Sequence, residues 1–233
     1  MRTVKVLVVC ALLCVVPLSM VQAQRTAGSF SIGAFGGINN IMSPEVPKDW
    51  LKMGIGFGGE LKYNLTKMTA LTANFTYISH EVEVDAMNED FDSIFPGATL
   101  EYEGGDLKAN IISGNVLQYL TKPEASFGLY ATIGAGYYMV KTTTATMKLS
   151  YMGTVISDET WDEESEDKFG LNGGLGFEIM MGDKLSLFAE GKYHLVFTGQ
   201  GDEDDAEFEE AIGKKITGKT SFISAMGGIR FSL

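Results

Sequence analysis

Six charged residues lie within segments in which apolar residues alternate with small or polar ones, and all six fall on the polar side of that alternation. They are Glu60, Lys62, Glu178, Glu190, Lys192 and Arg230. Acidic and basic side chains that share the inner face of a closed sheet can neutralise one another through hydrogen-bonded ion pairs. We therefore expect most of these residues to form a charge network inside the fold. The alternative is that they serve only as polar filling of a narrow interior.

Three stretches, residues 81–106, 158–167 and 202–210, hold most of the 30 acidic residues. Clustered carboxylates supply the oxygen ligands that Ca²⁺ and Mg²⁺ prefer, although no stretch has the spaced ligands and central glycine of a calcium loop. The candidate metal ligands are Asp202, Asp204 and Asp205. We interpret the stretches as solvated loops, disordered in part, and keep divalent-cation binding as the alternative.

Residues suited to catalysis are few. Only His80 and His194 can act as imidazole bases, and neither has a serine at a diagnostic spacing. The glycine-rich segment 54–59 opens no predicted helix, so it does not indicate a phosphate site. Both cysteines, Cys10 and Cys14, lie in a segment that we expect to be removed, which excludes disulfides and thiolate metal sites from the mature chain. We predict that the protein is not an enzyme and has no cofactor.

The N-terminal segment has the pattern of a secretory signal peptide. Arg2 and Lys5 precede an apolar run over residues 6–16, and small residues follow up to Ala23. The run is shorter than the roughly 20 residues that a spanning helix needs. We expect cleavage after Ala23, which leaves residues 24–233 as one exported domain. The net charge of −12 makes nucleic acid an unfavourable partner.

Apolar residues recur with a period of two along the rest of the chain, which predicts eight strands. The segments are 30–38, 53–63, 71–77, 107–120, 127–139, 169–179, 185–197 and 223–233. Their connections alternate between tight turns and loops of ten residues or more. The register of the fourth strand stays open. The outward residues there are either Leu107, Ala109, Ile111, Leu117 and Tyr119, or Ile112, Val116 and Leu120, and a bulge near Ser113 would reconcile the two sets.

Alternating short turns and long loops are typical of transmembrane β-barrels, whereas a soluble sandwich or lipocalin-like barrel is the alternative. The face opposite the apolar stripe is rich in Gly, Ser, Thr and Asn, which favours lipid outside and a narrow polar lumen inside. The fold class is therefore predicted to be all-β, an eight-stranded antiparallel up-and-down transmembrane β-barrel with short periplasmic turns and long acidic external loops. Two aromatic girdles are expected, with Tyr63, Tyr119, Phe127 and Phe231 near the turns and Tyr77, Phe169 and Phe197 near the loops.

The last predicted strand places Ile229, Phe231 and Leu233 on one face, and this pattern resembles the assembly signal of outer-membrane barrels. Together with the glycine-rich alternation over nearly all of residues 24–233, the chain resembles the small outer-membrane β-barrel family of the OmpA and OmpX type. It departs from the family's usual aromatic terminus by ending in Leu233. The resemblance implies a location in the bacterial outer membrane, contact with membrane lipid and lipopolysaccharide, and insertion by the barrel-assembly machinery.

Two functions follow from these expectations. The first is a structural or surface-interaction role in the cell envelope, with a lumen filled by polar side chains and loops that contact an extracellular ligand. The alternative is a narrow pore or conduit for small hydrophilic or amphipathic molecules.

Overall fold

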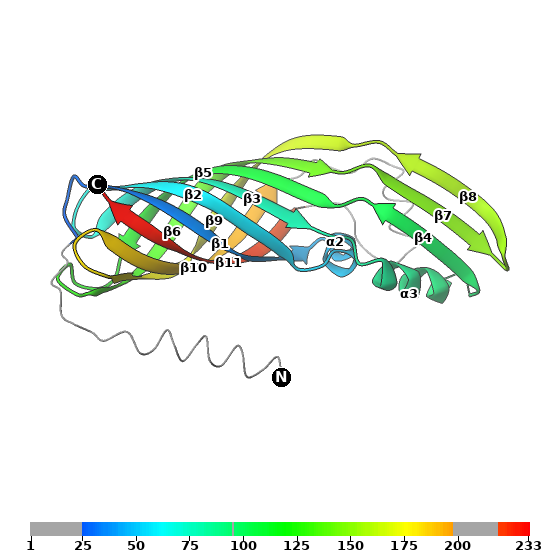
Figure 1. Ribbon diagram of the computed structural model, residues 1–233, viewed down its shortest axis with the longest axis horizontal. Coiled ribbons are helices and arrows are strands. Elements are labelled where there is room, and N and C mark those ends of the chain that lie inside the picture. Colours follow the sequence, from blue (N-terminus) through cyan, green and yellow to red (C-terminus); the bar gives the residue numbers. More distant parts are fainter. Residues whose placement is uncertain (1–24, 95, 198–218) are drawn as a thin grey trace.

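The computed structural model describes residues 25–94, 96–197 and 219–233 (Figure 1). The expected signal peptide, residues 1–23, lies outside the described residues. So do the candidate metal ligands Asp202, Asp204 and Asp205.

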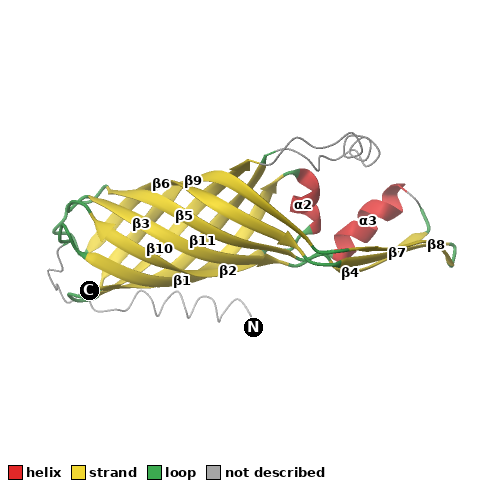
Figure 2. Ribbon diagram, turned by 90° about the horizontal axis from the view of Figure 1, so that it is seen from above, coloured by secondary structure: helices red, strands yellow, loops and turns green. Residues whose placement is uncertain are grey.

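Eight antiparallel strands close into a barrel (Figure 2). They are β1 (Phe30–Ser43), β2 (Gly54–Asn64), β3 (Thr69–His80), β5 (Leu107–Tyr119), β6 (Phe127–Thr142), β9 (Glu164–Met180), β10 (Leu185–Phe197) and β11 (Thr220–Ser232). The barrel closes where β1 pairs with β11 on one side and with β2 on the other. Closure leaves no unpaired strand edge, as backbone groups in hydrocarbon require. The predicted eight-stranded all-β barrel is confirmed.

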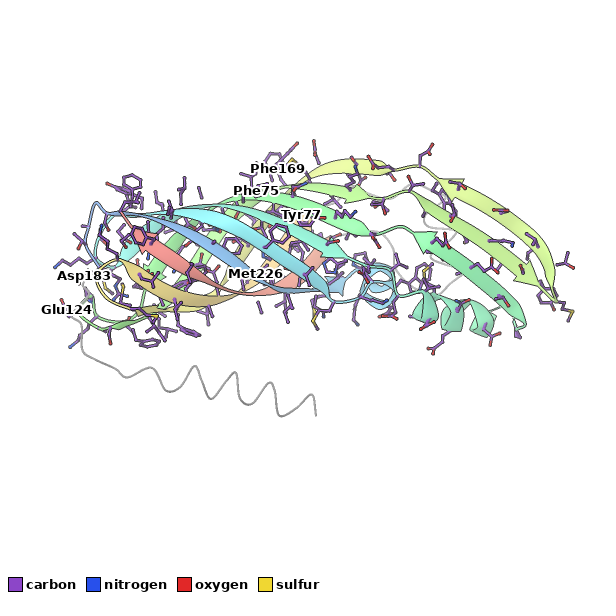
Figure 3. All side chains as sticks on the ribbon, viewed as in Figure 1. Phe75, Tyr77, Glu124, Phe169, Asp183 and Met226 are labelled. Atoms are coloured by element: carbon purple, nitrogen blue, oxygen red, sulfur yellow. The ribbon has the colours of Figure 1, made fainter. Side chains whose placement is uncertain are left out.

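The two ends of the barrel differ. Short connections join β2 to β3, β5 to β6 and β9 to β10 at one end, where Glu124 and Asp183 lie (Figure 3). At the other end, the three connections that the structure describes contain further elements. These are α2 (Glu45–Trp50), α3 (Val84–Ile94), β4 (Ala98–Gly104), β7 (Ala145–Tyr151) and β8 (Thr154–Trp161). Neither described helix has the length and apolar character needed to span a membrane.

The strands β4, β7 and β8 form a three-stranded sheet, here called the external sheet, which projects beyond the barrel (Figure 1). It continues from three neighbouring barrel strands: short connections join β4 to β5, β6 to β7 and β8 to β9. The first two acidic stretches were predicted to be solvated loops, disordered in part, and that prediction is wrong, because most of their residues lie in α3, β4, β8 and the start of β9. Their order has an apolar basis, since Met87 of α3 and Leu100 of β4 are both buried where the helix contacts the sheet.

Apolar side chains cover the outside of the barrel, as the alternation predicts. Phe57, Ile133 and Leu175 are 57%, 69% and 62% exposed. In β5, Ile112 points outward whereas Ile111 is buried, and the pairing of β5 with β3 and β6 continues without a register shift. The open register is therefore settled without a bulge near Ser113: Ile112, Val116 and Leu120 face outward.

The placement of Tyr119 in the aromatic girdle near the turns is also wrong, because its side chain is 1% exposed and points into the lumen. Phe127 and Phe231 are exposed at that end, as expected. Toward the other end, the rings of Tyr77 and Phe169 lie on the outer surface (Figure 3). Each contacts a neighbouring aromatic ring, at centroid distances of 5.2 Å and 5.1 Å.

Two adjacent glycines of β9, Gly173 and Gly174, allow a test of how closely the interior of the barrel is packed. A Cβ on Gly174, which faces the lumen, would lie 2.0 Å from the backbone oxygen of Gly191, whereas one on Gly173 would lie 3.4 Å from the oxygen of Thr132. We expect Gly174→Ala to prevent folding or to destabilise the barrel by about 1–3 kcal/mol or more, because the obstructing atom is backbone. Gly173→Ala is the matched control. Urea titration followed by gel mobility measures both, and equal stability of the two variants would contradict the described packing.

Candidate functional site

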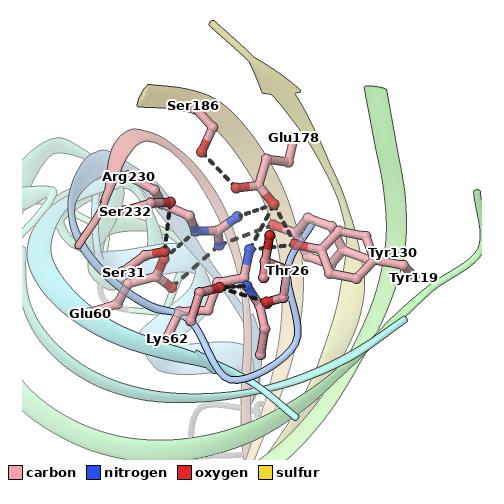
Figure 4. Close-up of polar contacts among 12 residues, drawn as sticks. Thr26, Ser31, Glu60, Lys62, Tyr119, Tyr130, Glu178, Ser186, Arg230 and Ser232 are labelled. Atoms are coloured by element: carbon pink, nitrogen blue, oxygen red, sulfur yellow. Dashed lines mark hydrogen bonds and ion pairs between the residues drawn. The ribbon is translucent and has the colours of Figure 1, made fainter. Parts of the chain in front are cut away.

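The turn-side half of the lumen contains a network of buried charged side chains (Figure 4). Arg230 of β11 donates through Nε to Oε1 of Glu60 on β2, and its Nη2 lies 3.3 Å from Oε2 of the same carboxylate. Its Nη1 lies 3.4 Å from Oε2 of Glu178 on β9. Lys62 of β2 donates to that same oxygen at 2.9 Å. Two cations and two carboxylates thus balance within a buried region, where each ion needs a partner of opposite charge.

Glu178 is the centre of the network. Its Oε1 accepts a hydrogen bond of 2.6 Å from Ser186 Oγ, and its Oε2 accepts one from Tyr119 Oη in addition to the two cations. Lys62 Nζ also lies 2.5 Å from Tyr119 Oη. Because both carboxylate oxygens have buried donors, the negative charge of Glu178 is held by direct contacts rather than by solvent.

The register of the barrel explains why Arg230 meets Glu60. Gly33 of β1 is paired with Arg230 on one side and with Glu60 on the other. A Cβ on Gly33 would lie 3.1 Å from Glu60 Cγ and 3.0 Å from the backbone oxygen of Ile229. The bare glycine therefore leaves the space in which two long side chains reach each other across an intervening strand.

Aromatic rings and one further arginine surround the network. The Arg230 guanidinium carbon lies 3.8 Å from the ring centroid of Phe188, and Tyr130 Oη lies 3.5 Å from Arg230 Nη2. Arg25 precedes β1 and places its guanidinium 4.0 Å from the ring centroid of Tyr119, where it donates to the backbone oxygens of residues 121 and 122. Burial lowers the pKa of the Arg25 guanidinium, which nevertheless stays charged.

A small polar cavity lies on the loop side of the network. Its volume is about 30 Å³, which is room for about two water molecules. Glu190 and Lys192 line it and pair with each other at 2.6 Å along β10. Asn39 and Asn74 line the same cavity, and each carries a buried side-chain oxygen without a hydrogen-bond partner among the described residues. The cavity is therefore suited to ordered water.

An apolar layer, here called the lumen roof, closes the loop side of the lumen. It consists of Ile41, Ile78, Ile111, Tyr138, Val196 and Phe222. His194 lies beneath this layer, with Nδ1 2.9 Å from Tyr138 Oη and Nε2 3.1 Å from Ser224 Oγ, and its ring stacks on Phe222 at 4.2 Å. His80 lies at the end of β3, with Nδ1 3.0 Å from the backbone oxygen of Lys52.

The structure brings four of the six predicted charged residues into one network and leaves Glu190 and Lys192 as a separate pair. Sequence reasoning missed Tyr130 and Ser186, although both have lumen parity. It misplaced Tyr119 because the register of β5 was open, and nothing in the sequence pointed to Arg25. The residues proposed as an assembly signal, Ile229, Phe231 and Leu233, are exposed on the outer surface.

Acidic side chains do not converge on a metal site in the described part of the chain. Within residues 25–94, 96–197 and 219–233, no group of three His, Cys, Asp or Glu side chains has a geometry that would hold a metal ion. The acidic residues of 158–167 instead lie along β8, β9 and the short connection between them, and Glu163 and Glu166 pair with Lys141 and Lys168, respectively.

Comparison with known proteins gave one family and several similar structures. A family model described as the outer membrane protein beta-barrel domain matches residues 8–230. A major outer membrane protein from Thermus thermophilus has a TM-score of 0.55 at 10% identity, over 89% of this chain and 100% of that chain. A search of curated proteins found no match.

Two further solved structures have lower TM-scores. The N-terminal β-barrel domain of Pseudomonas aeruginosa OprF has a TM-score of 0.47 at 13% identity, over 89% of this chain and 98% of that chain. Ail, the attachment invasion locus protein of Yersinia pestis, has a TM-score of 0.46 at 14% identity, over 89% and 100%. At sequence identities of 10–14%, these similarities show the fold and not the function.

Removal of one network charge tests whether the ions support the fold. We expect Arg230→Met to destabilise the barrel by about 3–5 kcal/mol, because Glu60 and Glu178 would keep buried charges without their shared cation. Lys67→Met removes the same charge from an exposed turn and is the control. Urea unfolding in lipid vesicles measures both variants. A loss below about 1 kcal/mol for Arg230→Met would show that the network is filling rather than support.

Proposed function

The chain belongs to the outer membrane protein beta-barrel domain family, and from this premise we propose that it is an occluded structural barrel of the bacterial outer membrane that presents a surface-interaction sheet to the exterior. The observation that carries the proposal is the filling of the lumen by two barriers in series. Eight strands leave an interior only wide enough for side chains. The family and the fold are established, and the role of the barrel is the proposal.

The lower barrier is the ion network and the upper barrier is the lumen roof. Arg230 and Glu178 are both 2% exposed, and Tyr119 and Tyr130 fill the space beside them. The buried Phe222 and Tyr138 close the other side, with ring centroids 6.2 Å apart. A solute that entered from either end would have to displace paired ions and packed aromatic rings. These features support a rigid, closed barrel over an open channel.

The external sheet supports a role at the cell surface. It extends past the barrel at the end opposite the short turns (Figure 1). In barrels of this class the long connections face the exterior and the short turns face the periplasm. Loops and extensions carried by a rigid scaffold are common binding elements. We therefore propose that the barrel serves as an anchor for this sheet.

The remaining expectations extend the same proposal. The exposed apolar band contacts outer-membrane lipid and the acyl chains of lipopolysaccharide, and β11 with Ile229, Phe231 and Leu233 is the segment that the barrel-assembly machinery recognises. We propose no catalytic role, because both ring nitrogens of His194 contact buried hydroxyl groups and Nδ1 of His80 contacts backbone.

A narrow pore is the second candidate function. The polar cavity between the barriers favours it, since Glu60, Glu190 and Lys192 already surround a space large enough for water-sized molecules. Transport would require rearrangement of the ion network and of the lumen roof. In this form the protein would be a conduit for small hydrophilic or amphipathic molecules that opens only transiently.

Planar-bilayer conductance separates the two functions. We expect the wild-type protein to give at most rare, small openings, because both barriers are closed. Glu60→Ala and Arg230→Ala should increase the frequency of openings by removing the lower barrier, whereas Glu124→Ala, in an exposed turn, should leave them unchanged. Stable conductance of the wild-type protein would instead establish a water-filled pore.

A further inference from the structure

Residues 25–29, which precede β1, lie at the mouth of the lumen on the side of the short turns. The Nη2 atom of Arg25 donates hydrogen bonds of 3.0 Å and 2.6 Å to the backbone oxygens of Thr121 and Lys122. These oxygens belong to the turn between β5 and β6, and β6 lies four strands from β1 in either direction around the barrel. Arg25 therefore connects the start of the barrel to its opposite wall.

Hydrogen bonds to the end of β2 hold the base of this segment. The backbone nitrogen of Gly28 donates to the backbone oxygen of Asn64 at 2.7 Å, and Asn64 Nδ2 donates to Ser29 Oγ at 2.9 Å. Ser29 Oγ in turn donates to the backbone oxygen of Thr26 at 2.7 Å, and Thr26 makes polar contacts beside the ion network (Figure 4). Gly28 has a φ of 80°, which favours glycine. The base is thus fixed by contacts other than those of Arg25.

A glycine of β6 leaves the space that the Arg25 side chain fills. A Cβ on Gly128 would overlap Arg25 Nη1 and would lie 2.9 Å from the Tyr119 ring. The guanidinium lies over that ring, with its carbon 4.0 Å from the ring centroid. The hydroxyl group of Tyr119 contacts Glu178 and Lys62. Arg25 is therefore separated from the ion network by a single aromatic ring.

Arg25 is held by weaker contacts than the cations of the network. Arg230 and Lys62 each contact a carboxylate, whereas Arg25 forms no ion pair with a residue that the structure describes. Its Nε and Nη1 also have no hydrogen-bond partner among the described residues. A carboxylate holds a buried cation more firmly than carbonyl oxygens and an aromatic ring do. The contact across the mouth can therefore be released while the ion pairs stay intact.

From these contacts we propose that residues 25–29 form a strap across the turn-side mouth of the lumen, with Arg25 as its latch on the β5–β6 turn, and that this latch releases without opening the ion network. The strap is a third barrier, on the periplasmic side of the two described above. The inference rests on the proposed closed barrel and adds a movable closure at one end of it. Small solutes reach the outermost part of the lumen only when the latch is released.

Thiol labelling tests the strap on the full-length protein in lipid nanodiscs. Ser31 is buried on the lumen side of β1, two residues nearer to the turns than Gly33, so Ser31→Cys places a thiol of similar size just inside the mouth. We expect this thiol to react slowly with a small, charged methanethiosulfonate reagent. Arg25→Ala should raise its labelling rate at least tenfold. Peptide mapping by mass spectrometry identifies the labelled residue.

Matched variants separate release of the latch from general loosening of the barrel. Lys122→Ala removes an exposed charge from the same turn but keeps the backbone oxygen that Arg25 uses, so the rate should change less than twofold. Arg25→Lys keeps the charge without the planar guanidinium and should also raise the rate. Ser224→Cys, at a buried position beneath the lumen roof, should label slowly whether or not Arg25 is present. Heat-modifiable gel migration confirms that each variant has a folded barrel.

The two thiol positions separate this inference from the function on which it rests. Rapid labelling of Ser31→Cys with Arg25 in place, less than a tenfold increase on Arg25→Ala, or an equal increase on Lys122→Ala would overturn the strap alone. An equal increase at the Ser224→Cys position on Arg25→Ala would also overturn it, because Arg25 would then support the whole barrel. Rapid labelling at both positions with Arg25 in place would contradict the proposed closed barrel itself.

Discussion

The narrow bore of an eight-stranded barrel is the constraint on which the rest of the structure depends. The interior is just wide enough for side chains to fill it. A large inward side chain therefore has room only where a neighbouring inward position is glycine. A Cβ on Gly128 would lie 2.9 Å from the Tyr119 ring, and one on Gly176 would lie 2.4 Å from the Tyr130 ring. Gly33 has the same role between Arg230 and Glu60. The many inward glycines are thus the counterpart of a few large polar and aromatic side chains that close the lumen.

The same constraint decides how charge is placed. A buried ion loses hydration and is tolerated only with partners close by, and the four ions of the network balance two against two. The lumen passes from this ionic layer through a small polar cavity to the apolar lumen roof. Two inward apolar residues of β5 lie at different levels of this lumen. Ile111 packs in the lumen roof, and Leu117 packs beside Tyr119 and Tyr130 near the turns. Apolar residues on both faces of β5 are therefore expected once the lumen is known to be layered.

Sequence periodicity was sufficient for the eight strands of the barrel, their order and the face of the six predicted lumen charges, because the pleat of a strand fixes which side chains share a face. It could not supply the height of a residue along the barrel axis, which depends on stagger between strands, and so it did not separate Glu190 and Lys192 from the network. Tyr119 was misplaced because apolar residues occupy both faces of β5. The external sheet was missed because its acidic residues masked the alternation of Ala98, Leu100 and Tyr102, the apolar side of β4.

The central claim is that the apolar side chains of the barrel face lipid while the polar ones fill a closed interior. A scan of single cysteines along β6, from Leu129 to Gly136, labelled with a small fluorophore in vesicles that contain spin-labelled lipids, tests it most directly. The account predicts strong quenching at Leu129, Ala131, Ile133 and Ala135, and weak quenching or loss of folding at the positions between them. Quenching without a period of two, or quenching confined to the inward positions, would contradict it.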